Sequence, residues 1–277
     1  MMNAFSIDLE DWFHQLDSDA VPPQSQWAGL EGRVLDNAHA LLREFELRDL
    51  RVTFFVLGWV AERYPELVRE LVQRGHEIAS HGYGHELVYR IGEAAFRDDL
   101  KRSKDVIERA AGVVPKGYRA PGFSITWQTP WAFDVLAEEG FEYDSSVFPS
   151  TRAHGGMSGA EPLPSRLSNG MREYPISTIP LGRARLSYLG GGYLRLIPET
   201  LLLRFARAQQ RRGEPLILYI HPRDIDPGQP RLKLGLARSF RANVGLGGCL
   251  TKIQALLDEF SWGRISDLPE LEILGQG

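Results

Sequence analysis

The amino-acid sequence predicts an α/β fold with a parallel sheet, either closed into a barrel or doubly wound. Short β-rich apolar stretches alternate repeatedly with helical patterns along the 277 residues, as expected when helices connect parallel strands. The stretch 51–57 is apolar on consecutive residues, which is typical of a strand covered on both faces. We find neither a linker nor a repeat of about 20 to 50 residues, and therefore expect a single domain over residues 1–277.

Residues 3–9 are expected to form the first strand, which ends in acidic residues. Further strands are predicted at 51–57, 77–80, 117–119, 141–144 and 216–220, and helices at 34–45, 65–75, 94–111, 129–139, 198–212 and 250–260. Apolar residues at helical spacing, a Pro in the first turn and a Gly at the end support the helices. The stretch 148–194, rich in Gly, Pro and Ser, breaks this rhythm, which is typical of a functional or flexible segment.

Composition excludes several classes of function. The formal net charge is −4, so there is no electrostatic footprint for nucleic acid. The one cysteine, Cys249, permits no internal disulfide and no cysteine-based zinc site, and we expect a buried, inert thiol. No apolar run is long enough to span a bilayer, and residues 1–9 lack the pattern of a signal peptide. We therefore expect a cytoplasmic protein whose metal ligands, if any, are His and carboxylates.

Polar residues with catalytic chemistry follow the predicted strands. They are Asp8, Glu10 and Asp11; His81 and His85; Arg119; Asp144; and His221. Taken alone, each motif could also have a purely structural role, as a solvated loop, a surface ion pair or a core histidine. Because the carboxyl ends of parallel strands meet at one edge, their recurrence there predicts an active site. Two imidazoles and one carboxylate would leave a position open for water, as in a catalytic zinc site.

Together, these motifs resemble the polysaccharide deacetylase family, the NodB-homology carbohydrate esterases, over nearly the whole chain. The family's motifs correspond, in order, to Asp8-Leu9-Glu10-Asp11, Ser80-His81 with His85, Arg119-Ala120-Pro121-Gly122, Tyr143-Asp144-Ser145-Ser146 and Tyr219-Ile220-His221-Pro222. The resemblance implies a distorted (β/α)7 barrel. It also implies metal-dependent removal of N-acetyl groups from amino sugars of a polysaccharide or its precursor, with release of acetate.

The resemblance also implies catalytic roles. Asp8 would be the general base, His221 would protonate the leaving amine, Arg119 would orient Asp8, and Asp144 would tune His221. Trp12, Tyr83, Pro121 and Gly122 are expected to bind substrate. Tyr219 stands where the family usually has Leu.

A divalent metal would be held by His81, His85 and one carboxylate. Zinc is the first expectation, and cobalt, nickel and iron are alternatives. The family usually has two adjacent Asp in the first motif, whereas this chain has Asp8-x-Glu10-Asp11. The ligand is therefore Glu10 or Asp11, and Glu10 is favoured because it shares a face with Asp8 on an extended chain.

Residues 8–14, 190–198 and 221–234 look like those of deacetylases from exopolysaccharide loci associated with PEP-CTERM sorting, and 189–267 looks like their C-terminal extension. Tyr188 and Tyr193 could form a sugar-binding rim or fill the core. Two other functions stay open. One is hydrolysis of another C–N bond, in a ureide or formamide, on the same fold. The other is sugar binding without catalysis.

Overall fold

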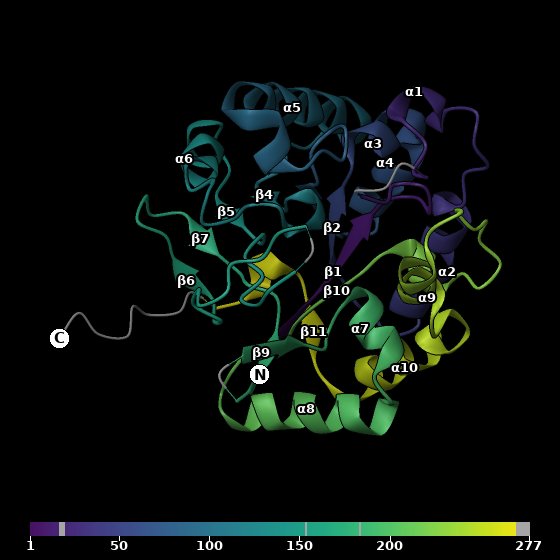
Figure 1. Cartoon of the computed structure of the whole chain (residues 1–277), viewed down its shortest axis with the longest axis vertical. Coiled ribbons are helices and arrows are strands. Elements are labelled where there is room, and N and C mark those ends of the chain that lie inside the picture. The colour runs from purple at the N-terminus through teal and green to yellow at the C-terminus, as the bar shows by residue number, and fades with distance from the viewer. Residues whose placement is uncertain (17–19, 153, 183, 270–277) are drawn as a thin grey trace.

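The computed structural model describes residues 1–16, 20–152, 154–182 and 184–269 and confirms the α/β fold (Figure 1). The main sheet contains β1 (Asn3–Leu9), β2 (Thr53–Val56), β3 (Glu77–Ser80), β4 (Gly117–Tyr118), β5 (Tyr143–Asp144), β6 (Ser165–Arg166), β7 (Arg172–Glu173), β10 (Ile217–Ile220) and β11 (Trp262–Gly263). The strand order is β10-β1-β2-β3-β4-β5-β7-β6, with β11 also beside β1. Only the β6–β7 pair is antiparallel.

Helices surround this sheet (Figure 1), and two of them, α7 and α9, border the cavity described below. The helices are α1 (Gln24–Trp27), α2 (Val34–Glu46), α3 (Gly58–Arg63), α4 (Pro65–Gln73), α5 (Val88–Ala111), α6 (Trp131–Glu138), α7 (Gly191–Leu196), α8 (Glu199–Arg211), α9 (Leu236–Asn243) and α10 (Leu246–Glu259). Short 3-10 turns, η1 to η3, span Pro121–Phe123, Pro222–Ile225 and Ile265–Asp267. None of these helices is both long and apolar enough to cross a bilayer.

The sheet is curled. In the strand order, β2 and β3 separate β1 from β4, yet Arg119, directly after β4, donates hydrogen bonds to Ser6 and Asp8 of β1. Within the described residues, the outer strands β10 and β6 do not pair with each other. The sheet is therefore a half-barrel, in agreement with the distorted barrel that the motifs imply.

Burial explains why the sequence pattern predicted these elements. Every residue of β1 and β2 is buried, as expected from their continuous apolar character. One face of α2 packs inward, through Val34, Ala38, Leu41, Leu42 and Phe45. Pro65 begins α4, as predicted. Cys249 is fully buried in the core, as expected of an inert thiol.

The stretch 148–194 contains more order than its composition suggests. Besides β6, β7 and α7, it holds the hairpin of β8 (Thr178–Leu181) and β9 (Ala184–Ser187). These elements are too short to produce a clear hydrophobic period, which is why the sequence pattern missed them. The sequence pattern also missed α9, which buries none of its residues.

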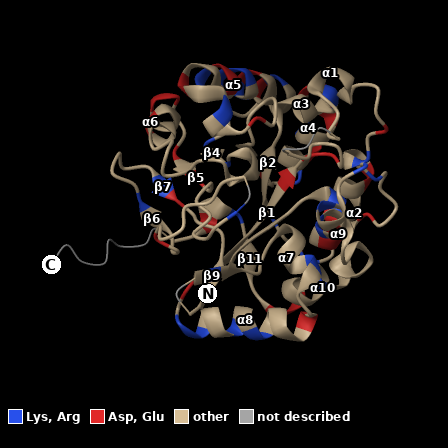
Figure 2. Cartoon of the chain, viewed as in Figure 1, with Lys and Arg blue, Asp and Glu red and all other residues tan. Residues whose placement is uncertain are grey.

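Acidic and basic residues are interspersed over the helices (Figure 2), consistent with the small net charge. One segment differs. Residues 227–257, which include α9 and most of α10, contain no Asp or Glu but carry Arg231, Lys233, Arg238, Arg241 and Lys252.

The close approach of the chain to Tyr219 requires glycine at position 190. Gly190 forms a bridge with Tyr219, and a Cβ added to it would lie 1.9 Å from Cε1 of the tyrosine ring. We expect Gly190→Ala to lower the free energy of unfolding by about 1–3 kcal/mol through overpacking. The matched control is Gly248→Ala in α10, where a Cβ would meet nothing within 4 Å. Its stability should change by less than about 1 kcal/mol. Urea unfolding measures both, and equal stability of the two variants would contradict the packing described.

Candidate active site

The first acidic motif lies at the carboxyl end of β1, near the middle of the sheet. β1 is in parallel register with β10 on one side and β2 on the other. Asp8 and Glu10 line one cavity, and only 2% and 4% of their surfaces are exposed. Because side chains alternate along an extended chain, these two carboxylates face the cavity while Leu9 packs into the core.

The second motif lies in the loop after β3, which neighbours β2. Asp99 of α5 holds this loop, because its carboxylate accepts the backbone N–H groups of Tyr83 (2.8 Å) and Gly84 (2.9 Å). The rings of His81 and His85 come to lie with their centroids 5.4 Å apart. The loop thus directs two imidazoles toward the carboxylates of the first motif.

Glu10, His81 and His85 form a group that could hold a metal ion, because one ligand atom from each lies within 4.8 Å of the others. Oε2 of Glu10 is buried, lies 2.5 Å from Nε2 of His85, and accepts no hydrogen bond of good geometry from the described residues. Nδ1 of His81 lies 2.8 Å from the carbonyl oxygen of Arg119. A proton on Nδ1 would leave Nε2 with the lone pair that a metal needs.

The electrostatics of this group suit a divalent cation. Burial alone would raise the pKa of Glu10, but His85 and His221 lower it to about 2. Burial lowers the pKa of His81 to about 4. An ionised carboxylate and a neutral imidazole are the forms that bind metals. This donor set of two imidazoles and one carboxylate therefore fits a divalent ion and leaves a coordination position open.

Asp11, the alternative metal ligand, lies elsewhere. Its carboxylate accepts the backbone N–H groups of Trp12 (2.8 Å), Arg33 (2.9 Å) and Val34 (3.1 Å). These contacts include N–H groups at the start of α2, where a helix lacks internal partners. The prediction of Asp11 as an alternative metal ligand is therefore corrected. Asp11 holds the start of α2, and Glu10 is the carboxylate beside the histidines.

Arg119 holds Asp8 in place. Its Nη1 donates to Oδ1 of Asp8 (2.7 Å) and to Oγ of Ser6 (2.8 Å), while Nε and Nη2 donate to the carbonyl and hydroxyl oxygens of Ser145 (3.1 and 2.8 Å). The guanidinium lies 4.0 Å from the ring centroid of Phe55 and is fully buried. The contact between Arg119 and Asp8 that the resemblance implied is present.

His221 follows β10 and faces both carboxylates of the first motif. Its Nε2 lies 3.3 Å from Oε1 of Glu10 and 3.9 Å from Oδ2 of Asp8. Its Nδ1 lies 3.0 Å from Oδ2 of Asp224, whose other oxygen pairs with Nε of Arg195 at 3.1 Å. Burial lowers the pKa of His221, but the carboxylates of Glu10 and Asp224 outweigh it, so the pKa is raised.

Asp144, which was expected to tune His221, bonds to another residue, and Asp224 is the carboxylate in contact with the imidazole. The carboxylate of Asp144 accepts hydrogen bonds from the hydroxyl (2.7 Å) and the backbone N–H (2.8 Å) of Ser146, and thereby braces the chain after β5. Asp224 occupies the expected place beside His221. The spacing His221-Pro-Arg-Asp224 is a sequence signal for this contact, because a 3-10 turn places residues i and i+3 next to each other.

Of the four residues expected to bind substrate, only Gly122 lines the cavity. Trp12 lies in the hydrophobic core and donates its indole N–H to a backbone carbonyl (2.9 Å). Tyr83 is buried beneath Arg102, whose guanidinium lies 3.5 Å from the ring centroid. Pro121 is buried at the start of η1. The predictions for Trp12, Tyr83 and Pro121 are thus corrected to structural roles.

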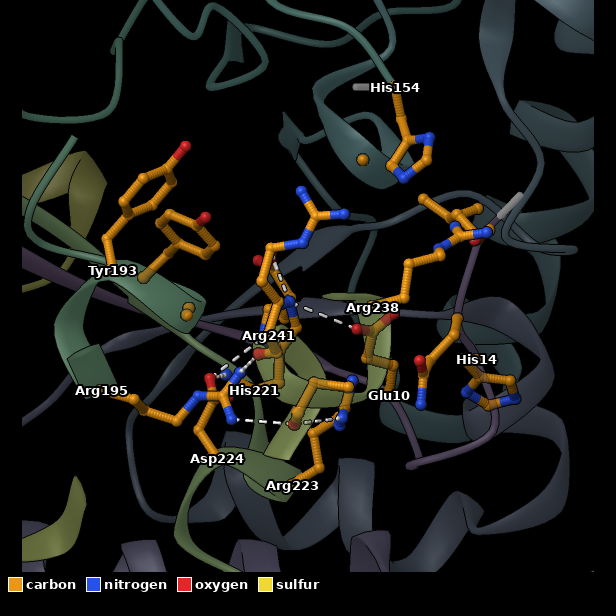
Figure 3. A pocket seen from close by; sticks show the side chains of 18 of the residues that line it. Glu10, His14, His154, Tyr193, Arg195, His221, Arg223, Asp224, Arg238 and Arg241 are labelled. Carbon is orange, nitrogen blue, oxygen red and sulfur yellow. Dashed lines mark hydrogen bonds and ion pairs between the residues drawn. The ribbon is translucent and has the colours of Figure 1, made fainter. Parts of the chain in front are cut away.

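The cavity has a volume of about 480 Å³ and is lined by Asp8, Glu10, His81, His85, His221 and Asp224. Figure 3 shows Glu10, His221 and Asp224 around it. Sequence reasoning missed several residues that line it, namely His14, Arg152, Arg195, Arg223, Arg238 and Arg241. Tyr193 also lines it, whereas Tyr188 is buried in the core with its hydroxyl 2.6 Å from Gln209. The absence of Asp and Glu from residues 227–257 was a sequence signal for two of these arginines, Arg238 and Arg241.

Comparison with known proteins agrees with this arrangement. The family model described as polysaccharide deacetylase matches residues 32–142, and that of a domain of unknown function (DUF3473) matches residues 145–270. A peptidoglycan-N-acetylglucosamine deacetylase of Bacillus cereus is 30% identical over 103 residues, which are 37% of this chain and 38% of that protein. The chain therefore spans less than two fifths of the length of this curated relative.

Solved structures share the fold. One described as a polysaccharide deacetylase from Mycobacterium smegmatis has 25% identity and a TM-score of 0.58, covering 94% of this chain and 87% of that one. Puue allantoinase has 17% identity and a TM-score of 0.60, covering 95% and 87%. At this identity the allantoinase shows the fold alone.

The two matched regions both contribute to the cavity. His81, His85 and Arg119 lie within the first, and Arg195, His221 and Asp224 lie within the second. Residues 32–142 carry a polysaccharide deacetylase domain, and residues 145–270 carry the domain of unknown function DUF3473.

Proposed function

We propose that this protein removes N-acetyl groups from amino sugars of a polysaccharide or its precursor, releasing acetate, with a divalent metal as cofactor. One observation carries the proposal: the group of Glu10, His81 and His85 shares its cavity with Asp8 and His221. Amide hydrolysis needs a base, an acid and a carbonyl-polarising group around one carbon atom. The likeness of the second half to deacetylases of exopolysaccharide loci favours an exopolysaccharide as the polymer.

Glu10, His81 and His85 would hold the metal, and zinc suits their donor set best. When bound at such a site, a divalent ion supplies Lewis-acid chemistry, polarising a carbonyl and lowering the pKa of a water molecule. Nδ1 of His81, fixed on the carbonyl of Arg119, keeps this ring in one orientation.

Asp8 would accept the proton of the attacking water. Its Oδ1 accepts a hydrogen bond from Arg119 at 2.7 Å, so Oδ2 is the oxygen left to take a proton. Burial excludes bulk water from this carboxylate, which keeps the proton transfer local.

His221 would give a proton to the leaving amine from Nε2. Its Nδ1–H points to Asp224, which fixes the tautomer and favours the protonated ring. Arg195 in turn holds Asp224 through the second carboxylate oxygen. The acid and the base thus come from strands β10 and β1, which are neighbours in the sheet.

The metal site is tested by zinc binding. We expect Glu10→Gln to weaken zinc binding by more than the roughly 10–100-fold that a change outside the ligand set costs. Asp11→Asn is the matched control, because it removes a neighbouring buried charge that contacts backbone N–H groups. The affinity of the Asp11→Asn variant for zinc should stay close to that of the unchanged protein. Competition against a chromophoric chelator measures both, and equal losses would contradict the assignment.

The base is tested by turnover. Asp8→Asn should keep its zinc but lower kcat for acetate release from N-acetylglucosamine oligomers by about 10²–10⁴-fold. The control is Asp36→Asn, an exposed carboxylate on α2, which should retain full activity. Unchanged kcat in Asp8→Asn would remove Asp8 as the base. A different released product, with no acetate, would favour hydrolysis of another C–N bond.

Comparison of the Asp224→Asn and Asp144→Asn variants tests whether Asp224 is the carboxylate partner of His221. Asp224→Asn should lower kcat on the order of 10²-fold or more with little change in KM, because the imidazole loses the carboxylate that sets its tautomer. Asp144→Asn, which alters a carboxylate bonded to Ser146, should leave kcat far less affected. Equal losses of activity in the Asp144 and Asp224 variants would contradict the assignment of Asp224 as the partner of His221.

A further inference from the structure

The cavity carries more positive charge than the proposed reaction needs. Five arginines line it, namely Arg152, Arg195, Arg223, Arg238 and Arg241. The carboxylates that line it are Asp8, Glu10 and Asp224. Figure 3 shows Arg223, Arg238 and Arg241 around the same space as Glu10 and His221.

Each lining carboxylate already has a partner. Asp8 pairs with Arg119 at 2.7 Å, and Glu10 lies 2.5 Å from Nε2 of His85. Asp224 is taken by Arg195 and His221. These acids therefore do not neutralise the remaining arginines.

Three of the arginines form no ion pair with the described residues. Nε of Arg223 donates to the amide oxygen of Gln229 (3.2 Å) and Nη2 to the carbonyl of Ala242 (3.1 Å), both neutral acceptors. Arg152 donates to the hydroxyl of Tyr219 (3.0 Å) and stacks on two phenylalanine rings. The exposed side chain of Arg241 has no hydrogen bond or ion pair among the described residues.

Arg195 and Arg223 hold the backbone that carries Arg241. Arg195 donates to the carbonyls of Arg241 (3.0 Å), Ala242 (2.9 Å) and Val244 (3.2 Å), and Arg223 binds the same Ala242 carbonyl. The C-terminal end of α9 is thereby fastened to the cavity wall. Burial lowers the pKa of Arg223, which indicates a partly desolvated cation without full compensation.

We propose that Arg152, Arg223 and Arg241 form a subsite for an anionic group, a phosphate or a carboxylate, on the N-acetylated sugar. This rests on the proposed function, because the same cavity must hold the acetamide. A guanidinium presents a planar fork of N–H donors that matches both groups, often in bidentate fashion. A neutral sugar would leave the partly buried cations without a counter-charge, which is costly.

The test is equilibrium binding of three monosaccharides to the zinc-loaded full chain by calorimetry. N-acetylglucosamine is the neutral probe, N-acetylglucosamine 1-phosphate carries a phosphate, and N-acetylmuramic acid carries a carboxylate. At least one anionic sugar should bind about tenfold or more tightly than the neutral one. The anionic sugar that is preferred identifies the group.

Arginine variants then locate the subsite. Arg241→Gln should remove most of that preference and leave binding of the neutral sugar unchanged, since the Arg241 side chain forms no hydrogen bond or ion pair with the described residues. Arg223→Gln should also lower the preference for the anionic sugar over the neutral one. Arg231→Gln removes an exposed positive charge nearby that does not line the cavity, and should keep the preference.

Two results would overturn the proposal: equal affinity for neutral and anionic sugars, or a preference that survives in both Arg241→Gln and Arg223→Gln. A preference that survives in both variants would indicate that the anionic group binds the metal instead of the arginines. Acetate release is measured in parallel on the same sugars. A preference that depends on the arginines, without acetate release, would refute the proposed reaction and leave the anionic subsite standing.

Discussion

The site depends on one buried ion pair, between Arg119 and Asp8. The guanidinium of Arg119, after β4, reaches across the concave side of the sheet to β1 and lies on Phe55 of β2. The backbone carbonyl of Arg119 lies beside Nδ1 of His81, after β3. A buried charge is costly unless it is fully paired and hydrogen-bonded, and Arg119 meets this condition with Asp8, Ser6 and Ser145. The pair can form only if the sheet curls, so curvature and the placement of the carboxylate come from the same contact.

Around this pair, the two halves of the chain supply different parts of the site. The region up to Arg119 provides Asp8 and the group of Glu10, His81 and His85. The second half provides His221, which β10 brings beside β1, and Asp224 and Arg195 behind it. Because β10 pairs directly with β1, neither half contains a complete cavity. The arginines that border the cavity also come from the second half.

The sequence predicted the parts that follow from strand order. Polar residues after parallel strands must meet at one edge, and Asp8, His81, His85, Arg119 and His221 do so. Prediction failed where the direction of a side chain depends on packing. Trp12 and Tyr83 could equally line a sugar site or fill a core, and tertiary contacts decide. The motif that contains Asp144 does not reveal Asp224, which the short turn after His221 brings back to the imidazole. The arginines were missed because they converge only through the folding of residues 148–244.

The most direct measurement is the crystal structure of the zinc-loaded protein, with the metal located by its anomalous scattering. We predict one strongly occupied site, with Glu10, His81 and His85 as ligands at about 2.0–2.2 Å, and Asp8 beside it still bonded to Arg119. Zinc held by Asp11, zinc bound away from the two histidines, or an Asp8 carboxylate turned away from Arg119 would contradict it.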